Sequence, residues 1–142
     1  MKRYLFLISL VVLGLVSCNS SKNMVKLTDV KWVLETLDGN KPEMKESGNE
    51  VFIRLNGTEK RISGMAGCNR FFGNYEMEGK KLKFSHMGST RMACPDMEIE
   101  SVFFKMLEDT DSFVIKDNKL SLMQKGKVLA VFKSDDIKES KK

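Results

Sequence analysis

The stretch from Gly64 to Cys94 constrains this 142-residue chain more than any other part of its sequence. A cysteine lies near each end of the stretch, at Cys68 and Cys94, and apart from Cys18 the chain has no other cysteine. Glycine permits backbone bends that other residues resist, and four glycines punctuate the stretch: Gly64, Gly67, Gly73 and Gly79. This spacing predicts bends or close backbone approaches between short strands. We expect a structured turn over residues 68–74 and an irregular segment over residues 87–94.

Short β-rich segments separated by turn residues run through the chain. The expected strands lie at residues 30–37, 51–55, 61–66, near 75–78, near 82–84, and at 112–115, 119–123 and 128–132. Turn pairs such as Asp38-Gly39 and Asn56-Gly57 separate them, and the second of these is a strong hairpin signal. The pattern predicts a mainly β fold (α+β), in which about eight short antiparallel strands form a small barrel-like sheet.

One segment between the fifth and sixth strands has helical periodicity instead. Pro95-Asp96 resembles a helix start, and apolar residues follow at intervals of three and four up to about Glu108. The members of this apolar face are Ile99, Val102, Phe103, Met106 and Leu107. We therefore expect one amphipathic helix that buries this face against the sheet.

The amino terminus has the layout of an exported lipoprotein. Two basic residues precede an apolar run, Tyr4 to Val16, which is shorter than the ~20 residues of a membrane-spanning helix but typical of a secretory signal. The run ends in Leu15-Val16-Ser17-Cys18, which resembles a bacterial lipobox. The alternative is an ordinary signal peptide with a chance cysteine at its end. The lipobox predicts a signal peptide over residues 1–17 and a mature chain that begins at an acylated Cys18.

The rest of the chain divides into three parts on this prediction. Residues 18–26 form a flexible polar tether, residues 27–133 one folded domain, and residues 134–142 a charged tail. The residue after Cys18 is Asn19 rather than aspartate, which in enteric lipoproteins implies the outer membrane. We therefore expect a cell-envelope protein, anchored to the membrane through acyl chains such as palmitate on Cys18 and facing the periplasm.

The charge pattern does not favour nucleic acid as a partner. The formal net charge is +5 and 30% of residues are charged, which is ordinary for a globular domain. Basic residues do not form a single stripe with interleaved aromatic residues, as they do in many nucleic-acid-binding proteins. We expect no nucleic-acid binding.

Motifs spread over most of the mature chain resemble those of the META domain family, which includes heat-shock-associated HslJ-type lipoproteins. The motif residues are Trp32, Gly64, Gly67, Cys68, Asn69, Arg70, Phe71, Gly73, Tyr75, Thr90, Met92 and Cys94. The resemblance covers roughly residues 27–133. It implies an antiparallel barrel-like fold with a helix, export, and a role in the envelope linked to stress. It implies no particular reaction or substrate.

Cys68 and Cys94 leave several chemical interpretations open. An oxidising compartment favours a disulfide between them, and two buried free thiols are the next alternative. A zinc site could add His86 and Asp96, but the short cysteine spacing of structural zinc sites is absent. A catalytic Cys94–His86 dyad lacks an evident third group to orient the histidine. We expect a structural disulfide and no metal or other cofactor.

Other motif residues also allow two interpretations. The spacing of Met87, Met92 and Met97 could suggest copper, but methionine more often fills gaps in a core. Asn69 is expected to be a turn residue. Trp32 and Tyr75 are expected in the core, with a ligand mouth as the alternative.

Two arginines in the motifs, Arg70 and Arg91, have acidic residues close by in the sequence. They could pair with Glu76 or Glu98, or face solvent. As exposed charges they would contribute little to stability.

The residues do not combine a nucleophile, a base and an orienting group, so we expect a protein that is not an enzyme. The favoured function is a membrane-tethered envelope module, linked to stress, that binds an envelope protein or a lipid. The alternative is a carrier of a lipid or small apolar ligand inside the barrel. An apolar cavity of at least ~300 Å³ in the barrel would favour the carrier, whereas a filled interior would favour the module.

Overall fold

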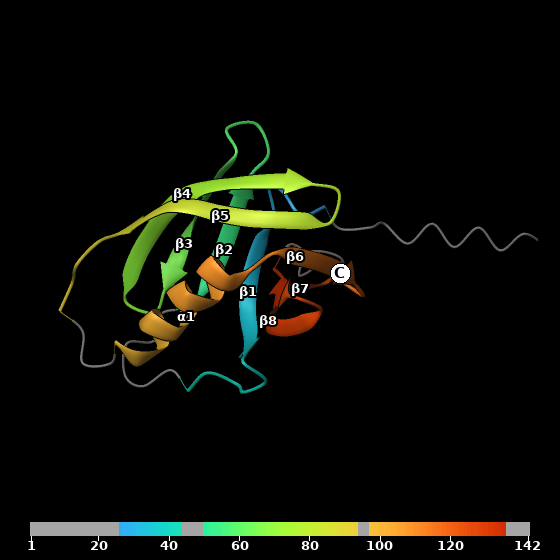
Figure 1. Cartoon of the computed structure of the whole chain (residues 1–142). Helices are drawn as coiled ribbons and strands as arrows, with labels where there is room; N and C mark the ends of the chain where they lie inside the picture. Colours follow the sequence, from blue (N-terminus) through green and yellow to red (C-terminus); the bar gives the residue numbers. More distant parts are fainter. Residues whose placement is uncertain (1–25, 44–49, 94–96, 136–142) are drawn as a thin grey trace, which may run out of the picture.

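The computed structural model describes residues 26–43, 50–93 and 97–135. Within these residues eight antiparallel strands and one helix follow one another along the chain (Figure 1). They are β1 (Lys31–Leu37), β2 (Phe52–Asn56), β3 (Arg61–Ala66), β4 (Asn69–Glu78), β5 (Lys81–Ser89), α1 (Glu98–Asp109), β6 (Ser112–Lys116), β7 (Lys119–Gln124) and β8 (Lys127–Ser134). The predicted fold class is confirmed, including the helix between the fifth and sixth strands.

The strands close into a barrel because β1 pairs with both β2 and β8. The weakest join is between β5 and β6, where only Lys81 and Ser112 are paired in register. Two flanking backbone hydrogen bonds support this join, from Leu82 N to Asp111 O (3.0 Å) and from Phe113 N to Lys80 O (3.0 Å). The chain passes from β5 through α1 to β6, so the helix lies across the region where the two strands have separated (Figure 1).

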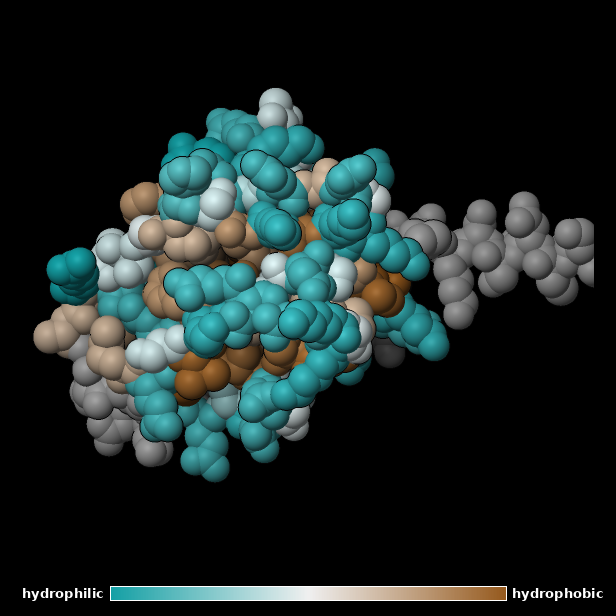
Figure 2. All heavy atoms as spheres, viewed as in Figure 1, coloured by the Kyte–Doolittle hydropathy of each residue, from teal (hydrophilic) through white to brown (hydrophobic). Residues whose placement is uncertain are grey.

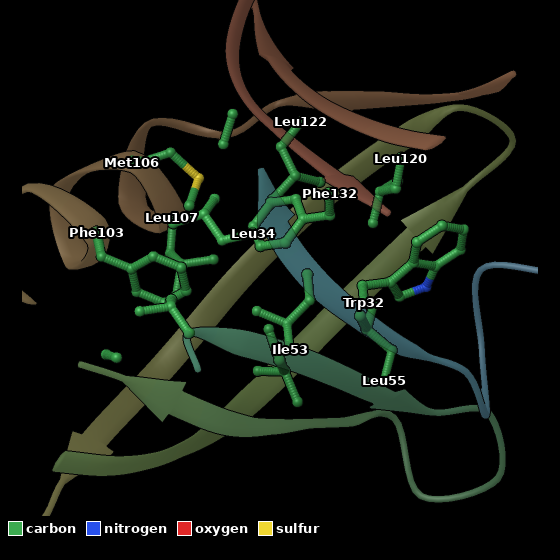
Figure 3. Packing of buried hydrophobic residues seen from close by; sticks show 14 of the residues in the cluster. Trp32, Leu34, Ile53, Leu55, Phe103, Met106, Leu107, Leu120, Leu122 and Phe132 are labelled. Carbon is green, nitrogen blue, oxygen red and sulfur yellow. The ribbon is translucent and has the colours of Figure 1, made fainter. Parts of the chain in front are cut away.

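Large apolar side chains fill the inside of the barrel. Every strand from β1 to β5 and both β7 and β8 contribute inward-facing residues, and α1 adds three from its buried face (Figure 3). The largest fully buried side chains are Trp32, Tyr75, Phe71, Phe103, Phe132, Ile53, Leu55, Ile62, Leu82, Leu107, Leu120 and Leu122. The alternative function, a carrier, would need the space that these side chains occupy.

The buried face of α1 differs from the predicted face at one position. Phe103, Met106 and Leu107 are buried as expected, but Val102 is 43% exposed. Successive residues of an α-helix are about 100° apart around its axis. Phe103 is at the centre of the buried side, and Val102 lies farther round the helix from Phe103 than Met106 does. The fourth buried residue of the helix is instead polar, Glu100. The helix also begins at Glu98, and the predicted start at Pro95-Asp96 lies outside the described residues.

Two predicted irregular segments are strands over part of their length. The turn expected over residues 68–74 is confined to Gly67-Cys68, because Ala66 already pairs with Asn69 across the hairpin. Gly67 has φ +89°, which suits the first position of a tight two-residue hairpin turn. Likewise, β5 continues to Ser89 through a bulge at which His86 has φ +52°. Residues 90–93 are irregular, as predicted.

The Asn56-Gly57 hairpin is present, with a four-residue turn. The Asn56 side chain caps this turn, since its Oδ1 accepts hydrogen bonds from Thr58 N (2.9 Å) and Glu59 N (2.8 Å). The Asn56 side chain therefore stabilises the turn through hydrogen bonds to the following backbone, as asparagine often does in turns.

The two ends of the described chain lie at the same end of the barrel. Backbone hydrogen bonds join Asp29 N to Leu55 O (2.8 Å) and Asp135 N to Lys31 O (3.0 Å). The segment after β5 emerges at the opposite end, on the left of Figure 1. Hydrophilic residues cover most of the face in Figure 2, with apolar residues visible beside α1. Within the described residues, no helix has the length and apolar character needed to cross a bilayer.

Candidate functional site

Three of the motif residues, Asn69, Thr90 and Met92, meet at the barrel end opposite the described termini. The Asn69 side chain is fully buried at the first position of β4. Its Oδ1 accepts hydrogen bonds from the Thr90 hydroxyl (2.9 Å) and from Met92 N (2.8 Å). Its Nδ2 donates to Glu100 Oε2 (2.9 Å) and, at 3.5 Å, to Met92 O. We call Asn69, Thr90, Met92 and Glu100 the Asn69 node.

The node joins three segments that are distant in sequence. Thr90 continues the pairing of β5 with β4, since Thr90 N donates to Arg70 O (2.9 Å) and Arg70 N donates to Thr90 Oγ1 (3.1 Å). Thr90 Oγ1 therefore accepts from Arg70 and donates to Asn69. Glu100 adds the first turn of α1, where a carboxylate also interacts favourably with the helix dipole. The prediction that Asn69 is a turn residue is wrong, because its partners lie 21 to 31 positions away.

Comparisons with known proteins identify the family of the chain. The META domain family model matches residues 25–136, which is most of the chain. This chain belongs to the META domain family. A comparison with curated proteins found no match.

Two solved structures resemble this META domain in fold. An NMR structure of a protein from Burkholderia xenovorans is 27% identical, with 76% of this chain and 83% of that chain covered and a TM-score of 0.62. A second NMR structure is 23% identical, with 78% of this chain and 95% of that chain covered and a TM-score of 0.59. The second likeness concerns the fold alone.

Only one of the three cysteines, Cys68, lies among the described residues. Cys68, in the turn before Asn69, is disulfide-bonded and half-buried. Cys94 and Cys18 lie outside the described residues, as does Asp96, so the Cys68–Cys94 pairing stays a prediction. His86 is exposed at the β5 bulge, where its Nδ1 lies 3.2 Å from Ser85 Oγ. Among the described residues, no three His, Cys, Asp or Glu side chains gather as a metal site requires.

Two motif glycines make room for neighbouring side chains and backbone. A Cβ on Gly64 would collide with the carbonyl oxygen of Phe52 and would lie 2.9 Å from the Phe71 ring. A Cβ on Gly73 would collide with the sulfur of Met87, whose side chain packs against the core. The backbone of Phe52 therefore approaches Gly64 closely, as predicted. Gly73 lies within β4 rather than in a turn.

The two motif aromatics lie in the core with their polar edges satisfied. Trp32 Nε1 donates to Leu27 O (2.9 Å), and the Tyr75 hydroxyl donates to Asn56 O (3.0 Å). Burial, and secondarily the negative charge of Asp29, raise the pKa of the Tyr75 hydroxyl above its usual value. These contacts match the core interpretation of both residues.

The three methionines of the copper alternative differ in their surroundings. Met87 packs against the core, whereas Met92 is 61% exposed and Met97 43% exposed. A further methionine, Met77, is 42% exposed on β4. Its Cα partner is Leu82, near the tip of the β4–β5 hairpin.

A second surface was missed by the sequence analysis. Outward-facing residues of β2, β3 and β4 form a grid in which cross-strand partners lie side by side. Its three rows are Phe52–Met65–Arg70, Arg54–Ser63–Phe72 and Asn56–Arg61–Asn74. We call these nine residues the arginine face. They include three of the five arginines in the chain and no carboxylate.

The alternation in β4 carries the signal for this surface. Arg70, Phe72 and Asn74 face outward, whereas Phe71 and Tyr75 face the core. This period-two pattern begins at Asn69, within the residues 68–74 for which a turn is predicted. Arg70 and Arg91 are both exposed, and in the described part of the chain neither lies in an ion pair with Glu76 or Glu98.

A shallow hollow of about 270 Å³ opens on the arginine face. Five residues of the arginine face line it together with Ile62, namely Arg54, Asn56, Arg61, Ser63 and Phe72. Asp29 and Glu59 stand at the edge near the β2–β3 turn. The hollow is outside the barrel, so it is a place for a group presented from solvent.

Proposed function

We propose that this META domain is a membrane-tethered lipoprotein of the cell envelope that acts as a non-catalytic interaction module. Its anchor would be acylated Cys18, and its site the periplasmic face of the outer membrane. The lipobox and Asn19 support the anchor and the location. The likeness of its motifs to those of HslJ-type lipoproteins supports a link to stress.

The filled barrel interior is the observation that favours an interaction module over a carrier. Trp32, Phe71, Phe103 and Phe132 are all at most 2% exposed and belong to the core cluster. Figure 3 shows Trp32, Phe103 and Phe132 in the interior together with aliphatic side chains. Protein interiors packed in this way leave few voids larger than a water molecule. A ligand would have to displace these side chains, so recognition on the outer surface is the simpler mode.

The Asn69 node supports a structural role for the motifs. Its polar groups are engaged with one another, and Asn69 and Glu100 are buried beneath the surface. A catalytic acid, base or nucleophile must reach a reacting group within hydrogen-bond distance. The satisfied bonds of the node give these residues a different task, which is to hold the helix and the barrel together.

The anchor is tested by partitioning between membrane and soluble fractions. A Cys18→Ala variant should leave the membrane fraction or accumulate as precursor, because it has no thiol to acylate. Ser17→Ala is the matched control, since it keeps a small residue before the cysteine. Membrane association of the Cys18→Ala variant at the level of the unaltered protein would remove the lipoprotein from this proposal.

The interaction role is tested in the protein's own cells by photo-crosslinking. A photoreactive side chain at the position of Ser63 reports on the arginine face, and one at Val128 reports on an exposed position of β8. A discrete crosslinked envelope protein from at least one position is expected. Native mass spectrometry of the membrane-purified protein should show no retained lipid beyond the anchor. A stoichiometric bound lipid would favour the carrier.

A further inference from the structure

We propose that the arginine face is a docking surface for an acidic segment of a partner protein, in which carboxylate side chains lie beside an apolar one. This inference rests on the proposed interaction role and names its surface and the chemistry of its partner.

The charge of the face is not neutralised by ion pairs among the described residues. Arg54, Arg61 and Arg70 lie one on each strand and in three different rows of the grid. All three are exposed, and within the described residues none of them forms an ion pair. Guanidinium groups bind carboxylates through two parallel hydrogen bonds and are only weakly hydrated, which suits them to interfaces.

The apolar part of the face is held in place before any partner arrives. Phe72 is 51% exposed, and its ring lies over Gly88 of β5, where a Cβ would be 3.0 Å from two ring atoms. The missing side chain of Gly88 lets the ring rest against the strand with its other side open to solvent. Aromatic residues, methionine and arginine are the types enriched in protein–protein interfaces. The face contains all three types, since Met65 lies in the next row.

The acidic edge of the hollow favours a polypeptide over a uniformly anionic partner. Asp29 and Glu59 stand beside the arginines, at the β2–β3 end of the hollow. A continuous array of lipid or nucleic-acid phosphates would meet these two carboxylates and be repelled. A polypeptide can place single acidic residues against the arginines and an apolar residue against Phe72. Strands lie about 4.8 Å apart, so the grid is roughly 10 Å wide, which an extended peptide of a few residues spans.

The test measures the binding of fluorescent peptides to the mature lipoprotein, purified in detergent. The probes are three peptides of equal length that alternate Glu with Phe, Lys with Phe, and Glu with Gly. The face variant combines Arg54→Gln, Arg61→Gln, Arg70→Gln and Phe72→Ala. The control combines Lys116→Gln, Lys125→Gln, Lys127→Gln and Val128→Ala, which removes the same charge and one exposed apolar side chain elsewhere. Near-ultraviolet circular dichroism of Trp32 checks the fold, and Arg61→Gln alone serves if the face variant does not fold.

The Glu–Phe peptide should bind, and the face variant should weaken its binding by about tenfold or more. The control should keep its affinity, the Lys–Phe peptide should not bind, and the Glu–Gly peptide should bind more weakly. Equal losses in the face variant and the control would overturn the proposal, because net charge would then explain binding. Failure of the Glu–Phe peptide to bind, or binding to phosphatidylglycerol vesicles that the face variant abolishes, would also overturn it.

This result is separable from the fate of the proposed function. Crosslinks through Val128 in cells, without peptide binding, would keep the interaction module and discard this surface. Peptide binding lost in the face variant, with no crosslinked protein from either position, would keep the surface chemistry and discard the proposed cellular role.

Discussion

The buried amide of Asn69 donates a 2.9 Å hydrogen bond to the carboxylate of Glu100, which joins the first residue of β4 to the first turn of α1. The helix has no side-chain cap at its amino terminus. This bond, together with the apolar packing of Ile99 and Phe103, holds that end of the helix against the barrel. The node therefore couples the motif residues Asn69, Thr90 and Met92 to the position of the helix.

Replacing Asn69 by alanine should destabilise the fold by about 3 kcal/mol. The change leaves Glu100, the Thr90 hydroxyl and Met92 N–H without their shared partner, and an unsatisfied buried polar group costs about 1–3 kcal/mol. Urea unfolding followed by Trp32 fluorescence measures the effect. Asn74→Ala, at an exposed position of the same strand, should change stability by less than about 0.5 kcal/mol. A loss below about 1 kcal/mol for Asn69→Ala would mean that the node is not structural.

The burial of α1 gives a prediction with an internal control. Phe103 is 0% exposed and its ring packs against Phe71 at a centroid distance of 5.5 Å. Phe103→Ala should cost about 3–5 kcal/mol in the free energy of unfolding. Val102→Ala, one residue earlier on the exposed side, should cost less than about 0.5 kcal/mol. Similar losses in the two variants would contradict the orientation of the helix.

The success and failure of prediction from the sequence follow from the range of the interactions involved. Strand alternation and helical spacing are local signals, so the eight strands and the helix could be recognised. The predicted turn over residues 68–74 includes Gly73. The sequence does not show that the Met87 side chain packs against this glycine, which is a long-range contact. The same holds for Asn69, whose hydrogen-bond partners are at least 21 positions away. The arginine face could not be predicted either, because its β4 residues share one side of the sheet only if residues 69–78 form a single strand.

Gly64 and Gly73 should respond differently to substitution by alanine. Gly73→Ala places a methyl group against the flexible side chain of Met87, so the double variant with Met87→Ala should be less destabilised than the sum of the two single changes. Gly64→Ala places the methyl group against the backbone carbonyl of Phe52, which cannot rotate away. We expect Gly64→Ala to be the more destabilising, and a double-mutant cycle in urea measures both effects. Strict additivity of Gly73→Ala and Met87→Ala would contradict the contact.

Tyr75 gives a prediction about alkaline pH. On the predicted cleavage it is the only tyrosine of the mature chain, because Tyr4 lies in the signal peptide. Burial raises the pKa of its hydroxyl in the folded state, so the neutral form is favoured there. Its contribution to stability is therefore complete below the unfolded pKa of about 10 and is lost as the pH rises through the folded pKa.

Absorbance of tyrosinate, titrated in the folded protein, should have its midpoint above that of the urea-unfolded chain. Tyr75→Phe should abolish the signal and cost about 1 kcal/mol at neutral pH through loss of the hydrogen bond to Asn56 O. Equal midpoints in the folded and unfolded states would refute the prediction.

The disulfide of Cys68 should stabilise the turn that leads into the Asn69 node. Cys94 is the predicted partner, and the loop between them has about 25 residues, for which the chain-entropy model gives roughly 3.5 kcal/mol. Cys68→Ser with Cys94→Ser should therefore lower stability by a few kcal/mol and leave the circular dichroism spectrum of the fold unchanged. Peptide mass mapping of the oxidised mature protein should find residues 68 and 94 in one cross-linked fragment. Cys18 is excluded from this pairing if its thiol is acylated. A fragment that joins Cys68 to Cys18 would contradict both the predicted pairing and the predicted anchor.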